Sequence, residues 1–147
     1  MKRKINKLCW AVMLMFLFTA TGCGSKYGEP VSGKIENDIT IGLAVRPSAP
    51  IVGDNGFKVT LQKMAVPLEN ADVRVSYLMP AMGSMPAMEG SNRATPTEHK
   101  GEYETSLNLP MEGSWTITVS AEVLGRPAIR AQYHLRTGSP SITFVGE

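Results

Sequence analysis

Apolar and polar side chains alternate along most of the chain after residue 38. This period of two puts successive side chains on opposite faces and is typical of half-buried β-strands. No segment of this region repeats apolar residues at helical spacing between end caps. The pattern predicts strands at residues 39–45, 57–62, 73–77, 103–109, 114–124 and 127–136, and it leaves a short strand at 92–97 open.

Turn-forming residues separate the predicted strands. Gly53-Asp54-Asn55-Gly56, Lys100-Gly101 and Glu112-Gly113 predict turns, and Leu124-Gly125-Arg126-Pro127 predicts a hairpin between the last two long strands. Short antiparallel strands at this spacing, in about 100 ordered residues, predict an all-β fold. We expect an immunoglobulin-like antiparallel β-sandwich of about seven strands, with a small barrel as the alternative.

The N-terminus has the pattern of an export signal. Four of the first seven residues are basic, and an uncharged apolar stretch follows from Leu8 to Phe18. This stretch falls short of the ~20 residues that cross a bilayer, so it predicts a signal peptide over residues 1–22. Ala20-Thr21-Gly22-Cys23 resembles a lipobox, which predicts a lipid anchor on Cys23. An ordinary secretory signal with an incidental cysteine is the alternative.

Removal of the signal peptide changes the composition of the chain. Four of the 15 basic residues leave with it, so 11 remain against 13 acidic residues, a net charge of about −2. Cys23 is the single cysteine left, which excludes an internal disulfide. Without a basic patch we expect no nucleic-acid partner. We expect a location in the cell envelope, on the outer membrane if the cell has one, because Gly24 rather than Asp follows the cysteine.

We predict four parts along the chain. Residues 1–22 are the signal peptide, and 23–38 are the lipidated cysteine with a flexible tether, because 24–38 is rich in Gly, Ser, Pro and charge. Residues 39–137 form one β-domain. Residues 138–147 are a tail that either adds an edge strand or stays loose.

A cluster of methionines stands between two predicted strands. Met79, Met82, Met85 and Met88 lie within ten residues, and the mature chain has six methionines in total. Two prolines and a glycine in this stretch predict an irregular loop. Thioethers are soft, neutral ligands that select Cu(I) and, in principle, Ag(I). Two alternatives to a metal site stay open: the methionines close one end of the core, or they form an adaptable contact surface for a partner.

Three further residues are weaker candidates for a metal site. Met111 is included as a ligand, although it is also placed to pack on the indole of Trp115. His99 is included as well, although its charged neighbours are typical of a solvated loop. His134 lies between Tyr133 and Leu135, so we expect it on the solvent side of its strand. We predict no enzyme, because no catalytic triad, phosphate-binding loop or zinc pattern is present.

Several short motifs resemble one family. They are Gly53-Asp54-Asn55, Ala71-Asp72-Val73 before the methionines, Gly101-Glu102-Tyr103, and Met111-Glu112-Gly113-Ser114-Trp115 followed by alternating residues. Over residues 40–136 the chain is similar to the YtkA-like domain, a relative of the FixH family. The resemblance implies an exported β-sandwich and extracytoplasmic copper handling, with heavy-metal efflux or copper-delivery proteins as partners. The chain departs from FixH because its apolar N-terminus ends in a lipobox.

The sequence thus supports two functional hypotheses. In the first, the membrane-anchored domain binds Cu(I) or Ag(I) through the methionine loop, and it needs no cofactor to fold. In the second, the same loop or a sheet edge is a metal-independent contact surface of an envelope or efflux complex.

Overall fold

The structure is a computed structural model that describes residues 26–35 and 38–146. The predicted signal peptide and the predicted lipid anchor at Cys23 lie outside these residues. The described chain forms ten antiparallel strands, which are β1 (Val31–Ile35), β2 (Ile39–Arg46), β3 (Gly53–Lys63), β4 (Val66–Pro67), β5 (Ala71–Met79), β6 (Met88–Pro96), β7 (Glu102–Leu109), β8 (Ser114–Val123), β9 (Ile129–Arg136) and β10 (Ile142–Gly146). Its residues include no helix with the length and apolar character needed to span a bilayer.

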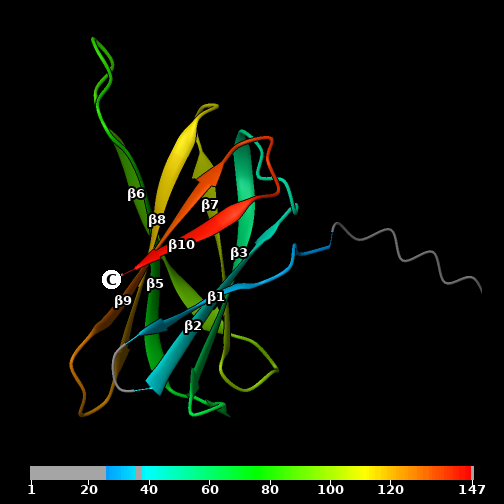
Figure 1. Cartoon of the computed structure of the whole chain (residues 1–147), viewed down its shortest axis with the longest axis vertical. Helices are drawn as coiled ribbons and strands as arrows, with labels where there is room; N and C mark the ends of the chain where they lie inside the picture. The colour runs from blue at the N-terminus through cyan, green and yellow to red at the C-terminus, as the bar shows by residue number, and fades with distance from the viewer. Residues whose placement is uncertain (1–25, 36–37, 147) are drawn as a thin grey trace, which may run out of the picture.

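The strands form one folded sheet in the order β1-β2-β3-β7-β6-β5-β8-β9-β10, with β4 beside β3. β6 pairs with β5 from Met88 to Ala94 and then with β7 at Thr95 and Pro96, so it passes from one layer to the other. The first and last strands of the sheet, β1 and β10, lie side by side. The fold is therefore the predicted all-β sandwich, with a nearly barrel-like closure (Figure 1).

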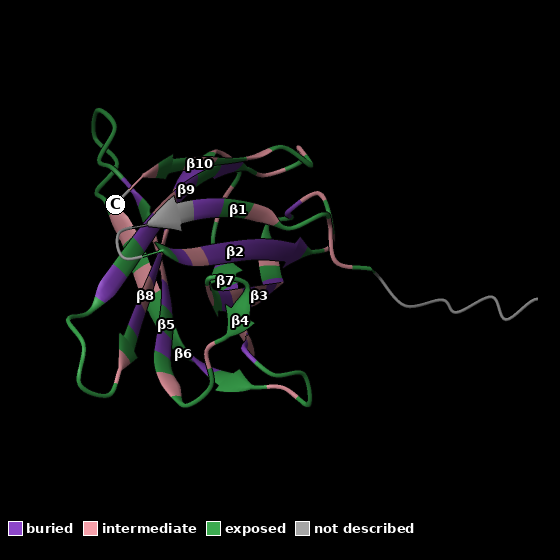
Figure 2. Ribbon diagram, turned by 60° about the horizontal axis from the view of Figure 1, so that its bottom comes forward, coloured by how far each residue is buried: buried purple, intermediate pink, exposed green. Residues whose placement is uncertain are grey.

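The alternating pattern identifies the core correctly. In β3, Phe57, Val59 and Leu61 are buried while their neighbours face outward, and β8 and β9 alternate in the same way. The buried residues of both layers form one core cluster, and Figure 2 marks the buried residues along the strands. Tyr133 adds a polar link between the layers, since its buried hydroxyl donates a 2.8 Å hydrogen bond to the carbonyl of Ile41.

Three strands go beyond the seven that the sequence predicts. β1 lies inside the segment predicted as a flexible tether, and it pairs with β2 from Val31 to Ile35. That part of the tether prediction is wrong, because backbone pairing with a buried strand orders polar residues whose composition resembles a linker. β4 consists of two residues that pair with β3. β10 pairs with β9, so the tail forms an edge strand, one of the two alternatives that the sequence left open.

The turn predicted at residues 53–56 is also wrong, because β3 begins at Gly53. Asn55 is fully buried there and acts as a backbone substitute: its side chain accepts a hydrogen bond from Ile51 N and donates to the carbonyls of Ile51 and Gly53, at 2.8–2.9 Å. The loop before β3 is thus held by a side chain whose local sequence is typical of a solvated turn.

The connections gather at two ends of the sandwich. One end, called here the hairpin end, carries the β5–β6, β2–β3, β7–β8 and β9–β10 connections and residues 26–30 (Figure 1). A hydrogen bond from Gly138 N to Pro50 O, 2.7 Å long, joins two of these connections. The opposite end carries the β1–β2, β3–β5, β6–β7 and β8–β9 connections.

Candidate functional site

The methionine segment is the connection of a β-hairpin: its outer methionines lie in strands, and the predicted loop between them is ordered by one isolated bridge. β5 and β6 pair up to Met79 and Met88, and beyond them Met82 and Met85 form a further antiparallel bridge. The two backbones exchange hydrogen bonds of 3.1 and 3.0 Å around a turn in which Gly83 adopts a φ of 58°. Pro80 and Pro86 lack an N–H and interrupt the ladder without ending the hairpin. This arm, residues 80–87, projects from the body of the molecule (Figure 1).

The methionines at the base of the arm belong to the core. Met79 is 1% exposed. A Cβ on Gly113 would lie 2.6 Å from the methyl carbon of Met79, so the absence of a side chain at Gly113 leaves the space that Met79 fills. Met88 and Met111 are half-buried and pack against the same core. For these residues the structure favours the alternative in which methionines close one end of the core.

The methionines at the tip of the arm are accessible. Met82 is 48% exposed and Met85 is 42% exposed. Directly opposed residues of an antiparallel pair have Cβ atoms about 5 Å apart and share one face, so both thioethers lie on the same side of the arm. Three residue steps separate Met79 from Met82, or about 10 Å of strand. The four methionines therefore form two pairs, and only the tip pair consists of two exposed residues.

The structure does not bring His99 to the methionines. It follows β6 in the β6–β7 connection at the opposite end, whereas Met88 begins β6 at the hairpin end. A nine-residue strand of about 30 Å separates the two. His134 is exposed on the outer face of β9, as expected, with its Nδ1 3.3 Å from the hydroxyl oxygen of Thr116. No group of three or more His, Cys, Asp or Glu side chains that could hold a metal occurs in the part of the chain that is described.

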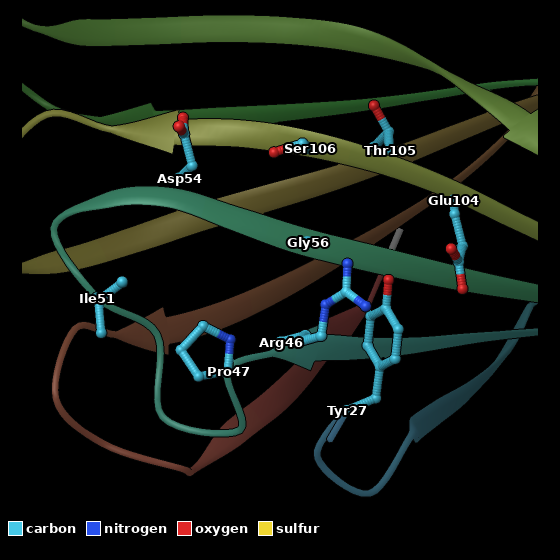
Figure 3. Close-up of a pocket in the computed structure, with 9 residues that line it drawn as sticks. All are labelled: Tyr27, Arg46, Pro47, Ile51, Asp54, Gly56, Glu104, Thr105 and Ser106. Carbon is cyan, nitrogen blue, oxygen red and sulfur yellow. The ribbon is translucent and has the colours of Figure 1, made fainter. Parts of the chain in front are cut away.

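A second candidate site, which the sequence did not indicate, lies on the outer face of β2, β3 and β7. A cavity of about 590 Å³ opens there. We call it the anchor-side cavity because Tyr27, in its lining, is four residues after Cys23, the predicted site of the lipid anchor. Its lining includes Tyr27, Arg46, Pro47, Ile51, Asp54 and Glu104 (Figure 3).

Tyr27 is held against this cavity by two cations. Its ring centre lies 4.9 Å from the Arg46 guanidinium carbon and 4.8 Å from Lys58 Nζ. Burial, followed by the nearby Glu104 carboxylate, raises the pKa of Tyr27 above its usual value near 10. Gly56 provides the space, because a Cβ there would come within 3.2 Å of the Tyr27 hydroxyl. A lone tyrosine in a polar segment was the one sequence signal for this contact.

Some charged side chains around the cavity have polar or charged partners, and Arg46 has no ion-pair partner among the described residues. Lys58 lies 3.4 and 3.5 Å from the carboxylates of Glu102 and Glu104, and Asp54 accepts a 2.9 Å hydrogen bond from Asn108. Arg46 makes no ion pair within the described residues and contacts only the Tyr27 ring through its charge. Its guanidinium is the one cation lining the cavity among these residues.

Two solved structures share the fold. A DUF4426 family protein from Pseudomonas aeruginosa matches with a TM-score of 0.54 at 14% identity, over 72% of this chain and 94% of that one. FetP from uropathogenic E. coli, expressed in the periplasm, matches with a TM-score of 0.52 at 10% identity, over 83% of this chain and 99% of that one. At such identities the likeness concerns the fold alone.

The family comparison agrees with the resemblance seen in the motifs. No curated protein matched the chain. The model of the YtkA-like family matches residues 33–120, which is more than half of the 147 residues and spans the sandwich from β1 into β8. The chain therefore belongs to the YtkA-like family.

Proposed function

We propose that this protein is an envelope lipoprotein, anchored through Cys23, that binds Cu(I) or Ag(I) through Met82 and Met85. The observation that carries the proposal is the backbone pairing that sets these two exposed thioethers side by side at the tip of the arm. Two neutral sulfurs form a soft site, which favours monovalent soft ions over hard or borderline divalent ones.

The rest of the molecule fits this role. Export would leave Cys23 as the single cysteine, and acylation removes its thiol, so methionine is the soft ligand that survives in an oxidising compartment. The buried Met79 holds the base of the arm in the core, which supports the tip without contributing a sulfur. His99, at the opposite end, takes no part in the proposed site.

The first prediction concerns Met82→Leu/Met85→Leu. Leucine keeps the size and apolar character of each side chain but removes the sulfur, so we expect Cu(I) affinity to fall at least tenfold while the fold is unchanged. The measurement is a Cu(I) titration of the mature, acylated chain in detergent against a competing chelator, with circular dichroism as the check on folding.

Met64→Leu is the matched control. Met64 is an exposed methionine in the β3–β4 turn at the opposite end, so its replacement should leave Cu(I) affinity unchanged. An unaltered affinity in the double variant, or an equal loss in the control, rules out the tip pair as the site.

A second function is favoured by the same exposure. Two apolar side chains on a projecting arm also suit contact with an envelope or efflux protein, without metal. In that case Met82→Leu/Met85→Leu retains capture of the partner, and Met82→Glu/Met85→Glu abolishes it in the absence of copper. Loss of copper binding in the leucine variant distinguishes the two functions.

A further inference from the structure

Apolar residues and one arginine lie at the anchor-side cavity, beside the carboxylates of Asp54 and Glu104. Ile51 and Val52, on the β2–β3 connection, are 49% and 47% exposed although both are branched apolar residues. Tyr27 and Arg46 line the same cavity as Ile51 (Figure 3). We call these four residues the anchor-side patch. Exposed aliphatic side chains beside an aromatic ring and an arginine are typical of surfaces that contact the headgroup region of a bilayer.

The path of the chain brings this patch close to the anchor. Gly28 N donates a 2.9 Å hydrogen bond to Val45 O, and the Tyr27 ring lies against Arg46 and Lys58. Only residues 24–26 separate Cys23 from Tyr27, which is at most about 14 Å of extended chain. One headgroup layer is about 5–8 Å thick. An acylated Cys23 therefore holds the patch within reach of the lipid headgroups.

Within the patch, Arg46 is the side chain that suits a phosphate. Two carboxylates line the same cavity: Asp54 accepts a hydrogen bond from the uncharged amide of Asn108, and Glu104 contacts Lys58. The Arg46 guanidinium has no carboxylate partner within the described chain, and its planar set of N–H donors suits a phosphate. Every phospholipid headgroup supplies such a phosphate.

We infer that the anchor-side patch rests on the bilayer surface, with Arg46 contacting a phospholipid phosphate and with Ile51 and Val52 at the boundary between headgroups and acyl chains. The inference depends on the proposed anchor at Cys23 but not on metal binding. It gives the domain a fixed orientation: the opposite end points away from the membrane. The arm with Met82 and Met85 lies at the same hairpin end as the patch but belongs to the other layer (Figure 1).

The second prediction tests this orientation by fluorescence quenching. Because the thiol of Cys23 is acylated, Val52→Cys and Leu124→Cys each give a single site for a thiol-reactive fluorophore. Leu124 is the matched control, being 97% exposed in the β8–β9 hairpin at the opposite end. The acylated full chain is placed in vesicles of phosphatidylethanolamine and phosphatidylglycerol that contain nitroxide-labelled lipid. We expect the probe at position 52 to be quenched several times more strongly than the probe at 124.

The contribution of Arg46 is tested in the same vesicles. In the Val52→Cys chain, Arg46→Glu should reduce the quenching, whereas Arg130→Glu, an exposed arginine on β9, should leave it unchanged. Equal quenching at positions 52 and 124 would show that the domain tumbles on its anchor, which contradicts the proposed orientation. Unchanged quenching in the Arg46→Glu variant would show that Arg46 does not contact a phosphate. The mass of the N-terminal peptide is measured first, so that a missing anchor, which contradicts the proposed function, is detected separately.

Discussion

At the scale of single residues, Asn55 is the clearest case of a polar side chain that holds the fold. It is the one buried polar residue in the described core, and it makes three hydrogen bonds to the backbone of the preceding loop. That loop carries Ile51 and Val52 of the anchor-side patch. The buried amide therefore links the stability of β3 to the position of the patch.

The third prediction is that Asn55→Ala lowers the free energy of unfolding by about 2–4 kcal/mol, because it leaves the Ile51 N–H and the Ile51 and Gly53 carbonyls without their partner. Asn108→Ala is the control, since that exposed amide bonds only to Asp54, and we expect a change within about 0.5 kcal/mol. The measurement is the urea midpoint at an unchanged slope. Equal midpoints for the two variants would contradict the structural role of Asn55.

Asn55 also shows why local composition is a poor guide to this turn. Gly, Asp, Asn and Gly in succession favour a solvated turn, and nothing in a short window distinguishes it from a strand whose first polar residue is buried. Tyr27 was missed for a similar reason, because its partners Arg46 and Lys58 come from strands that follow later in the chain. Period-two alternation, by contrast, is local, and it located Phe57, Val59 and Leu61 correctly.

At the scale of elements, the β5–β6 hairpin divides the methionine cluster into two roles. The sequence showed four methionines at a spacing of three, which suits one shared site as well as it suits packing. The hairpin register decides between these, because it opposes Met79 to Met88 and Met82 to Met85. Cross-strand register depends on how two segments meet, so it could not be predicted from spacing within one segment.

The fourth prediction concerns the base of the arm. An alanine at Gly113 would bring a Cβ within 2.6 Å of the Met79 methyl carbon at a φ of 150°, so we expect Gly113→Ala to cost about 2–4 kcal/mol of stability. Gly125→Ala, at a φ of 78° with no atom within 4 Å, adds left-handed backbone strain without a clash and should cost about 1–2 kcal/mol. Thermal unfolding measures both.

A double variant isolates the contact between Gly113 and Met79. In a Met79→Ala background the clash is absent, so Gly113→Ala should cost less than it does in the parent chain. If the full cost of Gly113→Ala persists in that background, backbone strain alone explains it and the packing of Met79 against Gly113 is unimportant. Cu(I) binding at the tip should be the same in every folded variant of this set.

At the scale of the whole molecule, the closure of the sheet could not be predicted from the sequence. Six long strands were located by alternation, and the sandwich class followed from their number and spacing. β1 was missed and β10 was left undecided, because both are short, partly polar edge strands whose order depends on a neighbour. Their contact is made by side chains: a Cβ on Gly33 would overlap the ring of Phe144, which also stacks edge-on to Tyr133 at 5.5 Å.

The fifth prediction follows from this contact between the two ends of the sheet. Phe144→Ala removes the ring that covers Gly33, so we expect a loss of about 2 kcal/mol, below the range for a fully buried phenylalanine because Phe144 is only half-buried. The loss should be local. Amide hydrogen exchange should accelerate in β1 and β10, while the central strands β5 and β8 keep their protection. Val145→Ala, next along β10 and exposed, should change neither quantity.

Because β1 continues from the segment that positions Tyr27, release of β1 should also weaken the quenching at position 52 in vesicles. Unchanged protection of β1 in Phe144→Ala would mean that pairing with β2 alone holds this strand, and that the orientation of the domain on the membrane does not depend on closure of the sheet.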